Sequence, residues 1–166
     1  MPDQIRRIDC FYLTVSDEPS EAASVLAAFQ SAGVNLLGIS VLPHGGHQSE
    51  LDLVPENSGD LRKAAKTAGL ELKRKKAGFL IQGDDRPGTM ARTANRLAEA
   101  NISDVSVEVF PDSSGHFGGI LWVGAADLRR AAKALGATSW KKPKPASKLA
   151  GYPSPFDEME EVSASA

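Results

Sequence analysis

The sequence predicts an α+β fold made of two copies of one βαββαβ unit with antiparallel sheets. The first observation is a repeat, because DLRKAAK at Asp60–Lys66 recurs with one conservative change as DLRRAAK at Asp127–Lys133. The second is that the preceding segments repeat at nearly the same spacing, so that GVNLLGISVLP at 33–43 aligns with NISDVSVEVFP at 101–111. The third is a hydrophobic period that switches between two and about 3.6 residues in the same order in both copies. A duplicated small domain explains all three observations.

The elements of the first copy follow from its hydrophobic spacing. Apolar residues alternate over Phe11–Val15, which predicts a strand, and they share one helical face from about Pro19 to Ala32. Alternation returns at Leu37–Val41, and the turn PHGGHQ separates this strand from LDLV, which predicts a hairpin. A second helix begins near Asp60, which we expect to cap it, and LELKRKK is the expected last strand.

The second copy repeats this order. AGFLIQG is its expected first strand and follows LELKRKK almost without a linker. Met90, Ala94 and Leu97 lie on one face of its first helix, and Val105–Val109 alternates as its second strand. Asp127 is expected to cap the second helix, and the copy is expected to end near ATSW. Each unit therefore has the ferredoxin-like split βαβ arrangement.

Three segments follow from the repeat. They are a first unit over 1–76, a second unit over 77–141, and a proline-rich, then acidic tail over 142–166 that is either disordered or packed across a neighbour. Units of about 65 residues are near the lower limit for an independent core, so we expect them to pack side by side, related by a pseudo-two-fold axis or by a simple side-by-side repeat. Leu61 and Leu128 should then occupy equivalent buried positions. The same argument predicts self-association as a homodimer.

Composition argues against several classes of partner. Hydrophobic residues make up 42% of the chain, and a formal net charge of −2 does not suit a protein that coats nucleic acid or an anionic membrane. The basic run Lys73–Lys76 lacks interleaved aromatic residues, which favours a solvated edge strand over a nucleic-acid patch. The single cysteine, Cys10, and the lack of a secretory leader or a long apolar run predict a cytoplasmic protein.

The segment GDDRPGTM, at 83–90, joins the first strand and the first helix of the second unit. Pro87 suits the first turn of a helix, Asp85 can cap it, and Gly88 allows another group to approach the backbone closely. A helix N-terminus exposes N–H groups at the positive end of the helix dipole, and these can bind a carboxylate or a phosphate. From the local chemistry alone, a well-made cap without a ligand is the simpler explanation.

This segment resembles the ACT domain, a small βαββαβ regulatory module attached to enzymes of amino-acid biosynthesis. The resemblance rests on Asp-Arg-Pro-Gly at 85–88, the helix after it and Ala-Asn-Ile at 100–102, and it covers both units from about Ile8 to Trp140. It implies that an amino acid lies between this loop and a neighbouring unit. The ligand-binding residues that it implies are Asp85, Arg86, Pro87, Gly88, Thr89, Met90, Ser103 and Asn35.

The first copy departs from the ACT pattern at the equivalent loop. Ser20 stands in place of the glycine, and Glu21 follows it directly. A carboxylate there would repel an anionic ligand, so we expect binding at the second unit. The sequence thus predicts a non-catalytic regulatory module, without a cofactor, that senses an amino-acid-like ligand or transmits its binding to a partner enzyme. A ligand-free module for protein–protein assembly is the main alternative, and the altered first loop favours it.

Two further functions are less well supported by the sequence. The two predicted hairpin turns contain three histidines, His44, His47 and His116, which suggest a metal-responsive protein. Histidines that are simply exposed in turns are the simpler explanation. Catalysis is not expected, because Asp84 and Asp85 are chain neighbours that point apart and no nucleophile is placed beside them. No residue is therefore assigned to a metal or to catalysis.

Overall fold

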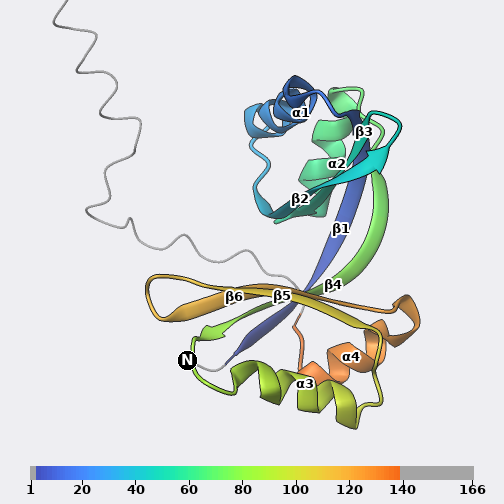
Figure 1. Cartoon of the computed structure of the whole chain (residues 1–166). Helices are drawn as coiled ribbons and strands as arrows, with labels where there is room; N and C mark the ends of the chain where they lie inside the picture. Colours follow the sequence, from blue (N-terminus) through green and yellow to red (C-terminus); the bar gives the residue numbers. More distant parts are fainter. Residues whose placement is uncertain (1–2, 139–166) are drawn as a thin grey trace, which may run out of the picture.

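The structure, a computed structural model, describes residues 3–138 and contains one six-stranded sheet with helices on one face (Figure 1). All neighbouring strands pair antiparallel, in the order β2-β3-β1-β4-β6-β5. The elements in chain order are β1 (Gln4–Ser16), α1 (Pro19–Ser31), β2 (Leu36–Gly45), β3 (Gln48–Pro55), α2 (Ser58–Thr67), β4 (Lys73–Asp84), α3 (Thr89–Glu99), β5 (Val105–Pro111), β6 (His116–Val123), the 3-10 turn η1 (Ala125–Asp127) and α4 (Leu128–Leu135).

Strands β1 and β4 are long and belong to both halves of the molecule. β1 pairs with β3 over Phe11–Ser16 and with β4 over Gln4–Tyr12, whereas β4 pairs with β6 over Gly78–Asp84. We call α1, β2, β3 and α2 the first lobe, and α3, β5, β6 and α4 the second lobe; Figure 1 shows the lobes at opposite ends of β1 and β4. Each lobe has the βαββαβ order expected from the sequence, with one long strand as its first and the other as its last.

The last strand of the second lobe is not the one that the sequence suggested. The stretch ATSW was expected to close the second copy, but the start of β1 already lies beside β4 in that place. Thr138 forms a parallel bridge to Arg6, donates to the Ile5 carbonyl at 2.9 Å and accepts from the Arg7 N–H at 3.0 Å. The expected boundary between units falls inside β4, and the tail at 142–166 lies outside the described residues.

The register of β1 and β4 reveals the symmetry of the repeat. Asp9 and Ala77, which the repeat places 68 residues apart, are directly paired with each other. In an antiparallel pair related by a two-fold axis, the residue on the axis faces its own copy, so this register indicates a pseudo-two-fold relation, one of the two expected arrangements. Phe11 and Phe79 are also separated by 68 residues, and their exposed fractions are 2% and 0%.

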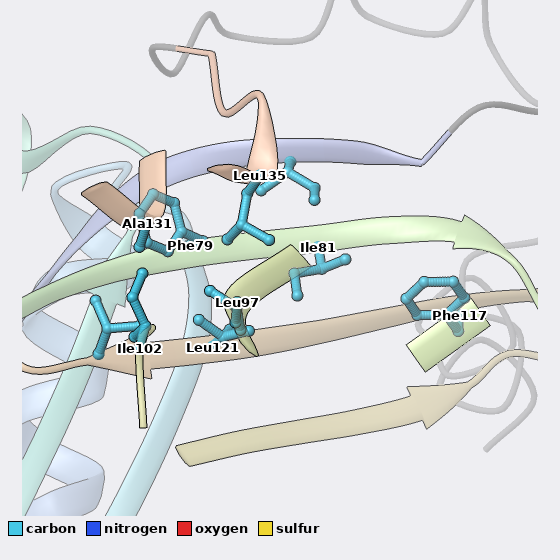
Figure 2. Close-up of a cluster of buried hydrophobic side chains, with 10 residues drawn as sticks. Phe79, Ile81, Leu97, Ile102, Phe117, Leu121, Ala131 and Leu135 are labelled. Carbon is cyan, nitrogen blue, oxygen red and sulfur yellow. The ribbon is translucent and has the colours of Figure 1, made fainter. Parts of the chain in front are cut away.

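Each lobe has its own hydrophobic core beneath its two helices. The core of the second lobe combines residues from both long strands with residues from α3, β6 and α4 (Figure 2), namely Ile5, Phe79, Ile81, Leu97, Ile102, Phe117, Leu121, Val123, Ala131 and Leu135. Leu61 is fully buried in the first core, whereas Leu128 is only partly buried against the second. The expected burial is therefore correct for Leu61 but not for Leu128. The turn η1 precedes α4, and the inward residues of α4 are Ala131 and Leu135.

The opposite, helix-free face of the sheet curves onto itself. Gly38 in β2 lies so close to β6 that a Cβ on it would be 2.8 Å from the Ile120 side chain, although three strands separate β2 from β6 in the sheet. Leu37, Ile120 and Trp122 pack there against a small buried cluster made of Ile8, Cys10, Val54 and Leu80. The strong coiling of the sheet thus hides part of the face that no helix covers.

Two helix caps differ from the sequence prediction. Asn57, and not Asp60, caps α2, because its side-chain oxygen accepts from the N–H groups of Gly59 at 2.8 Å and of Asp60 at 3.3 Å. Asp127 precedes α4 but makes no capping bond to its backbone, and its carboxylate pairs with Arg130 instead. The cap of α2 was misplaced because that helix begins at Ser58, before its first apolar residue Leu61, whereas Asp127 holds the N-cap position of α4 but makes no side-chain cap bond.

The basic run at the start of β4 is paired with other side chains and is not simply solvated. Lys75 occupies a bulge opposite β1 and bonds both Asp52 oxygens, at 2.8 and 3.0 Å, and also Glu50. Burial alone would lower the pKa of Lys75, but these hydrogen bonds outweigh it and raise that pKa. Arg74 pairs with Asp9 at 2.7 Å. The run therefore joins strands within the sheet.

Candidate ligand-binding site

The loop between β4 and α3 holds four of the eight residues assigned to the ligand, and the first two residues of α3, Thr89 and Met90, are two more. The Asp85 N–H donates to the Gly115 carbonyl at 2.9 Å, which fixes the loop beside the β5–β6 hairpin. Gly88 is the N-cap residue of α3 and has φ 84°, in the left-handed region where residues with a side chain are strained. Asp85 was expected as the cap, but no described side chain caps this helix. The Thr89 N–H donates to the Arg86 carbonyl at 3.2 Å, so the N–H groups of the next residues in the first turn of α3 are the ones left to solvent or a ligand.

Gly88 also leaves open space in front of the helix. A Cβ built on it would meet nothing within 4 Å. The glycine is thus required by the backbone conformation, and its lack of a side chain keeps the helix start accessible. Substitutions that test the site must keep the left-handed conformation, which Asn and Asp tolerate better than β-branched residues do.

The side chains around this helix start form a small polar network. Thr89 is buried, and its hydroxyl lies 3.4 Å from the Asp84 carbonyl and 3.1 Å from the Arg92 guanidinium. Arg86 is exposed and pairs with Asp84, while the His116 imidazole lies 3.7 Å from the same carboxylate. The first turn of α3 has no acidic residue, but carboxylates lie close to it, because Arg86 pairs with Asp84 and the Arg92 guanidinium lies 3.8 Å from the Asp3 carboxylate.

The equivalent start of α1 has the opposite charge. At the repeat spacing of 68, Glu18 corresponds to Arg86, Glu21 to Thr89 and Ser24 to Arg92. Glu21 lies in the first turn of α1, and Ser24 donates to the Ser20 carbonyl at 2.8 Å. Two carboxylates in the first lobe thus replace an arginine and a threonine of the second. An anion is favoured at α3 and disfavoured at α1.

The other assigned residues do not gather at this loop. Met90 packs against the second core. Ser103 follows the C-terminal end of α3, so the length of the helix, about 16 Å, separates it from the helix start. Asn35 lies in the first lobe, where its carbonyl accepts from the Glu56 N–H at 2.9 Å. Within one chain, the structure therefore joins the loop residues but neither Ser103 nor Asn35.

Asn35 instead lines a polar hollow of about 540 Å³ that sequence reasoning missed. Its other lining residues include Arg7 and Arg74 from the two long strands and Glu56 and Asp60 at the start of α2. These residues are far apart in the sequence and meet because β1 and β4 pass through both lobes. No local motif marks them, so the repeat pattern alone could not have revealed this hollow.

No metal centre is apparent in residues 3–138. Within that range no group of three or more His, Cys, Asp and Glu residues could hold a metal ion. Cys10 is buried as expected, and desolvation, followed by the charge of Asp52, raises the pKa of its thiol to about 11. The thiol therefore stays protonated at neutral pH. In the described part of the chain, no helix is long and apolar enough to cross a membrane.

Solved structures share this architecture. Protein BT0572 from Bacteroides thetaiotaomicron is similar with a TM-score of 0.62 and 12% identity, over 81% of this chain and 88% of that one. The ligand-free regulatory subunit of aspartate kinase from Thermus thermophilus is similar with a TM-score of 0.53 and 16% identity, over 81% and 94%. No protein-family model matches the sequence, and no curated protein does. At such identities the likeness concerns the fold, and the chain has an ACT-like fold, as the sequence predicts.

Proposed function

We propose that this chain is a non-catalytic regulatory module that binds an amino acid at the start of α3 and transmits that binding to a partner enzyme. The observation that supports it most is the contrast between the two equivalent helix starts. At α3 the N-cap is an open, left-handed glycine with arginines nearby, whereas at α1 acidic residues occupy the same places. This contrast favours a carboxylate in the ligand.

The proposed binding mode uses the two charged ends of the amino acid. Its carboxylate accepts hydrogen bonds from the N–H groups of Met90 and Ala91 in the first turn of α3, where the helix dipole favours negative charge. Its ammonium group meets the exposed Asp85 carboxylate or backbone carbonyls of a facing unit. Because Asn35 and Ser103 lie away from this loop in one chain, their proposed part in binding requires a second chain.

The proposal also includes the partner enzyme and the cellular location. The similar subunit from Thermus thermophilus is described as the regulatory subunit of an aspartate kinase, which supports an enzyme of amino-acid metabolism as the partner. The chain is proposed to act in the cytoplasm, as its cysteine usage predicts.

Self-association through edge strands is proposed together with ligand binding. β2 and β5 are the two edges of the sheet, and each exposes large apolar side chains: Ile39, Val41 and Leu42 on β2, and Val107 and Phe110 on β5. Exposed apolar edges of this kind promote strand pairing with another chain. Sedimentation of the wild type and of the variants Val41→Lys and Val107→Lys tests self-association. A wild-type chain that is monomeric at all concentrations would contradict this proposal.

The binding proposal is tested by a thermal-shift screen of the twenty amino acids, followed by calorimetry with the best ligand. Gly88→Asp and Gly88→Asn have nearly the same size and backbone strain, but only the first adds a negative charge beside the expected carboxylate. We expect Gly88→Asp to bind at least about tenfold more weakly than Gly88→Asn. The matched control is the same pair at Gly69, which has φ 68° and open space but lies after α2.

Three results would contradict the binding proposal. One is the absence of any amino-acid ligand in the screen. A second is equal affinity for Gly88→Asp and Gly88→Asn, because a carboxylate bound at the helix start must feel the added charge. A third is an equal effect of the Gly69 pair, which would show that the response is not local to α3. A ligand-free assembly module would give the first result and still self-associate.

A further inference from the structure

The curved, helix-free face encloses a hollow of about 440 Å³ that we call the inner hollow. Its floor is formed by the central strands, and its sides are formed by β2 and by the β5–β6 hairpin. Apolar side chains dominate the lining, with Leu42, Leu80, Phe110, Ile120 and Trp122 as the largest. A volume of this size falls within the range of small-molecule sites, and none of the loop residues at 85–90 lines it.

The volume of the inner hollow depends on one glycine. Gly118 points from β6 into this face, beside Ile120 and Trp122, and a Cβ on it would meet nothing within 4 Å. The next residue, Gly119, is different, since a Cβ there would lie 2.5 Å from the Glu108 carbonyl. The backbone thus requires a glycine at 119, whereas at 118 the missing side chain leaves room that a ligand can fill.

The charges of the inner hollow favour an anionic group. Lys76 is the basic residue among its described lining residues, and its ammonium group lies 4.3 Å from the centre of the Trp122 ring. Within residues 3–138 Lys76 forms no ion pair, in contrast to Lys75, whose charge is neutralised by Glu50 and Asp52. A carboxylate that reaches Lys76 would form a charge-assisted hydrogen bond at the edge of an apolar surface.

The two carboxylates of the lining limit the number of charges on the ligand. Asp52 is only 8% exposed and is engaged by Lys75, so it does not attract a cation. Glu108 stands on the exposed edge strand β5 and would repel a second acidic group. Cys10 contributes an uncharged thiol to the floor. A single negative charge at one end of an apolar body satisfies this lining.

We propose that the inner hollow binds a small monocarboxylic acid with an apolar body, which lies against Trp122 in the space over Gly118 with its carboxylate on the Lys76 ammonium. This site is separate from the amino-acid site proposed at α3. It lies between the two lobes, since β2 and β3 come from the first and β5 and β6 from the second. A bound acid would therefore contact both lobes at once.

Fluorescence of Trp122 provides a direct measurement. Trp140→Phe leaves Trp122 as the single tryptophan of the full-length chain, which is then titrated with phenylacetate, hexanoate and the neutral analogue phenylacetamide. We expect saturable changes in fluorescence, with phenylacetate bound more tightly than phenylacetamide.

Lys76→Gln should weaken the binding of phenylacetate at least about tenfold and leave the binding of phenylacetamide unchanged. Gly118→Leu should abolish binding of both, because its side chain fills the hollow, while the melting temperature does not fall. Lys63→Gln, which removes a positive charge from the exposed side of α2, is the control for a general effect of charge.

The proposal is overturned by any of four results. These are no saturable change with either acid, equal affinity for acid and amide, unaltered binding in Gly118→Leu, or an effect of Lys63→Gln as large as that of Lys76→Gln. If binding survives in Gly88→Asp, the inner hollow is shown to act separately from the site at α3.

Discussion

The two lobes share a topology and even share strands, yet their helix starts and their ion pairs differ. In the first lobe Asn57 caps α2 with its side chain and Lys75 ties β4 to two carboxylates on β3. In the second lobe Gly88 opens α3 without any side-chain cap, and Gly118 leaves an empty place in β6. The first lobe therefore has these side-chain contacts, whereas the second has two glycines, Gly88 and Gly118, beside open space. Duplication has kept the fold while its copies diverged in chemistry.

The largest expected contrast concerns the first leucine of the repeated heptapeptide. Leu61→Ala should lower the free energy of unfolding by about 3 kcal/mol, because the side chain is fully buried and leaves a cavity. Leu128→Ala should cost about 1 kcal/mol, since this leucine is only partly buried. Urea denaturation of both variants measures the difference. Equal losses would show that α4 packs as deeply as α2.

The next contrast uses a pair of basic residues at the repeat spacing of 68, Arg7 and Lys75. Lys75→Met should cost about 2 kcal/mol, because Asp52 would be left partly buried without its partner; the figure is below that of a fully buried pair because Lys75 is partly exposed. Arg7→Met should change stability by less than about 0.5 kcal/mol, because Arg7 is exposed. Chemical denaturation decides between them, and a larger loss for Arg7→Met would contradict the assigned ion pairs.

The helix caps give a smaller contrast. Asn57→Ala removes two hydrogen bonds to the start of α2 and should cost about 1 kcal/mol. Asp127→Ala removes only an exposed ion pair with Arg130 and should cost about 0.3 kcal/mol. Thermal unfolding monitored by circular dichroism can resolve both. The reverse order would mean that Asp127 caps α4 in solution.

The ion pair of Lys75 also predicts a pH dependence. The hydrogen bond from Lys75, with smaller contributions from nearby charges, lowers the pKa of Glu50 below its ordinary value of 4.5. A carboxyl group with a lowered folded-state pKa stabilises the protein above its unfolded-state pKa, and the effect is lost as the pH falls through the folded-state pKa. Glu50→Gln should therefore be less stable than wild type at pH 7, by up to about 1 kcal/mol, and the difference should disappear at low pH. A difference that is constant with pH would contradict this account.

The sequence predicted the order of the elements because each hydrophobic period is a local property. Phe11, Leu61 and Leu97 were placed on the correct faces from their spacing alone. The sharing of β1 and β4 could not be predicted, because a strand that serves two lobes has the same alternation as one that serves a single lobe. The bulge at Lys75 and the polar hollow that Arg7 and Asn57 both line depend on strand register. A sequence repeat does not specify that register.

The candidate site was predictable in part, because part of it is also local in the sequence. The loop at 85–88 is contiguous, so its residues are necessarily together, and the structure adds that Gly88 is left-handed. Asn35 and Ser103 were assigned by resemblance, and neither lies at this loop within one chain. The inner hollow left no trace in the sequence, since Lys76, Gly118 and Trp122 meet only through the pairing of β4 with β6.

The stoichiometry of amino-acid binding tests the contrast between the lobes most directly. Calorimetry of the full-length chain with its best amino-acid ligand should give one site per chain, because among the helices of residues 3–138 only α3 has an open glycine as its N-cap and no acidic residue in its first turn. Gly88→Asp should remove this site, whereas Ser20→Asp in the first lobe should leave the affinity and the stoichiometry unchanged. Two sites per chain, or an equal loss from both substitutions, would contradict the claim that the lobes have diverged in this way.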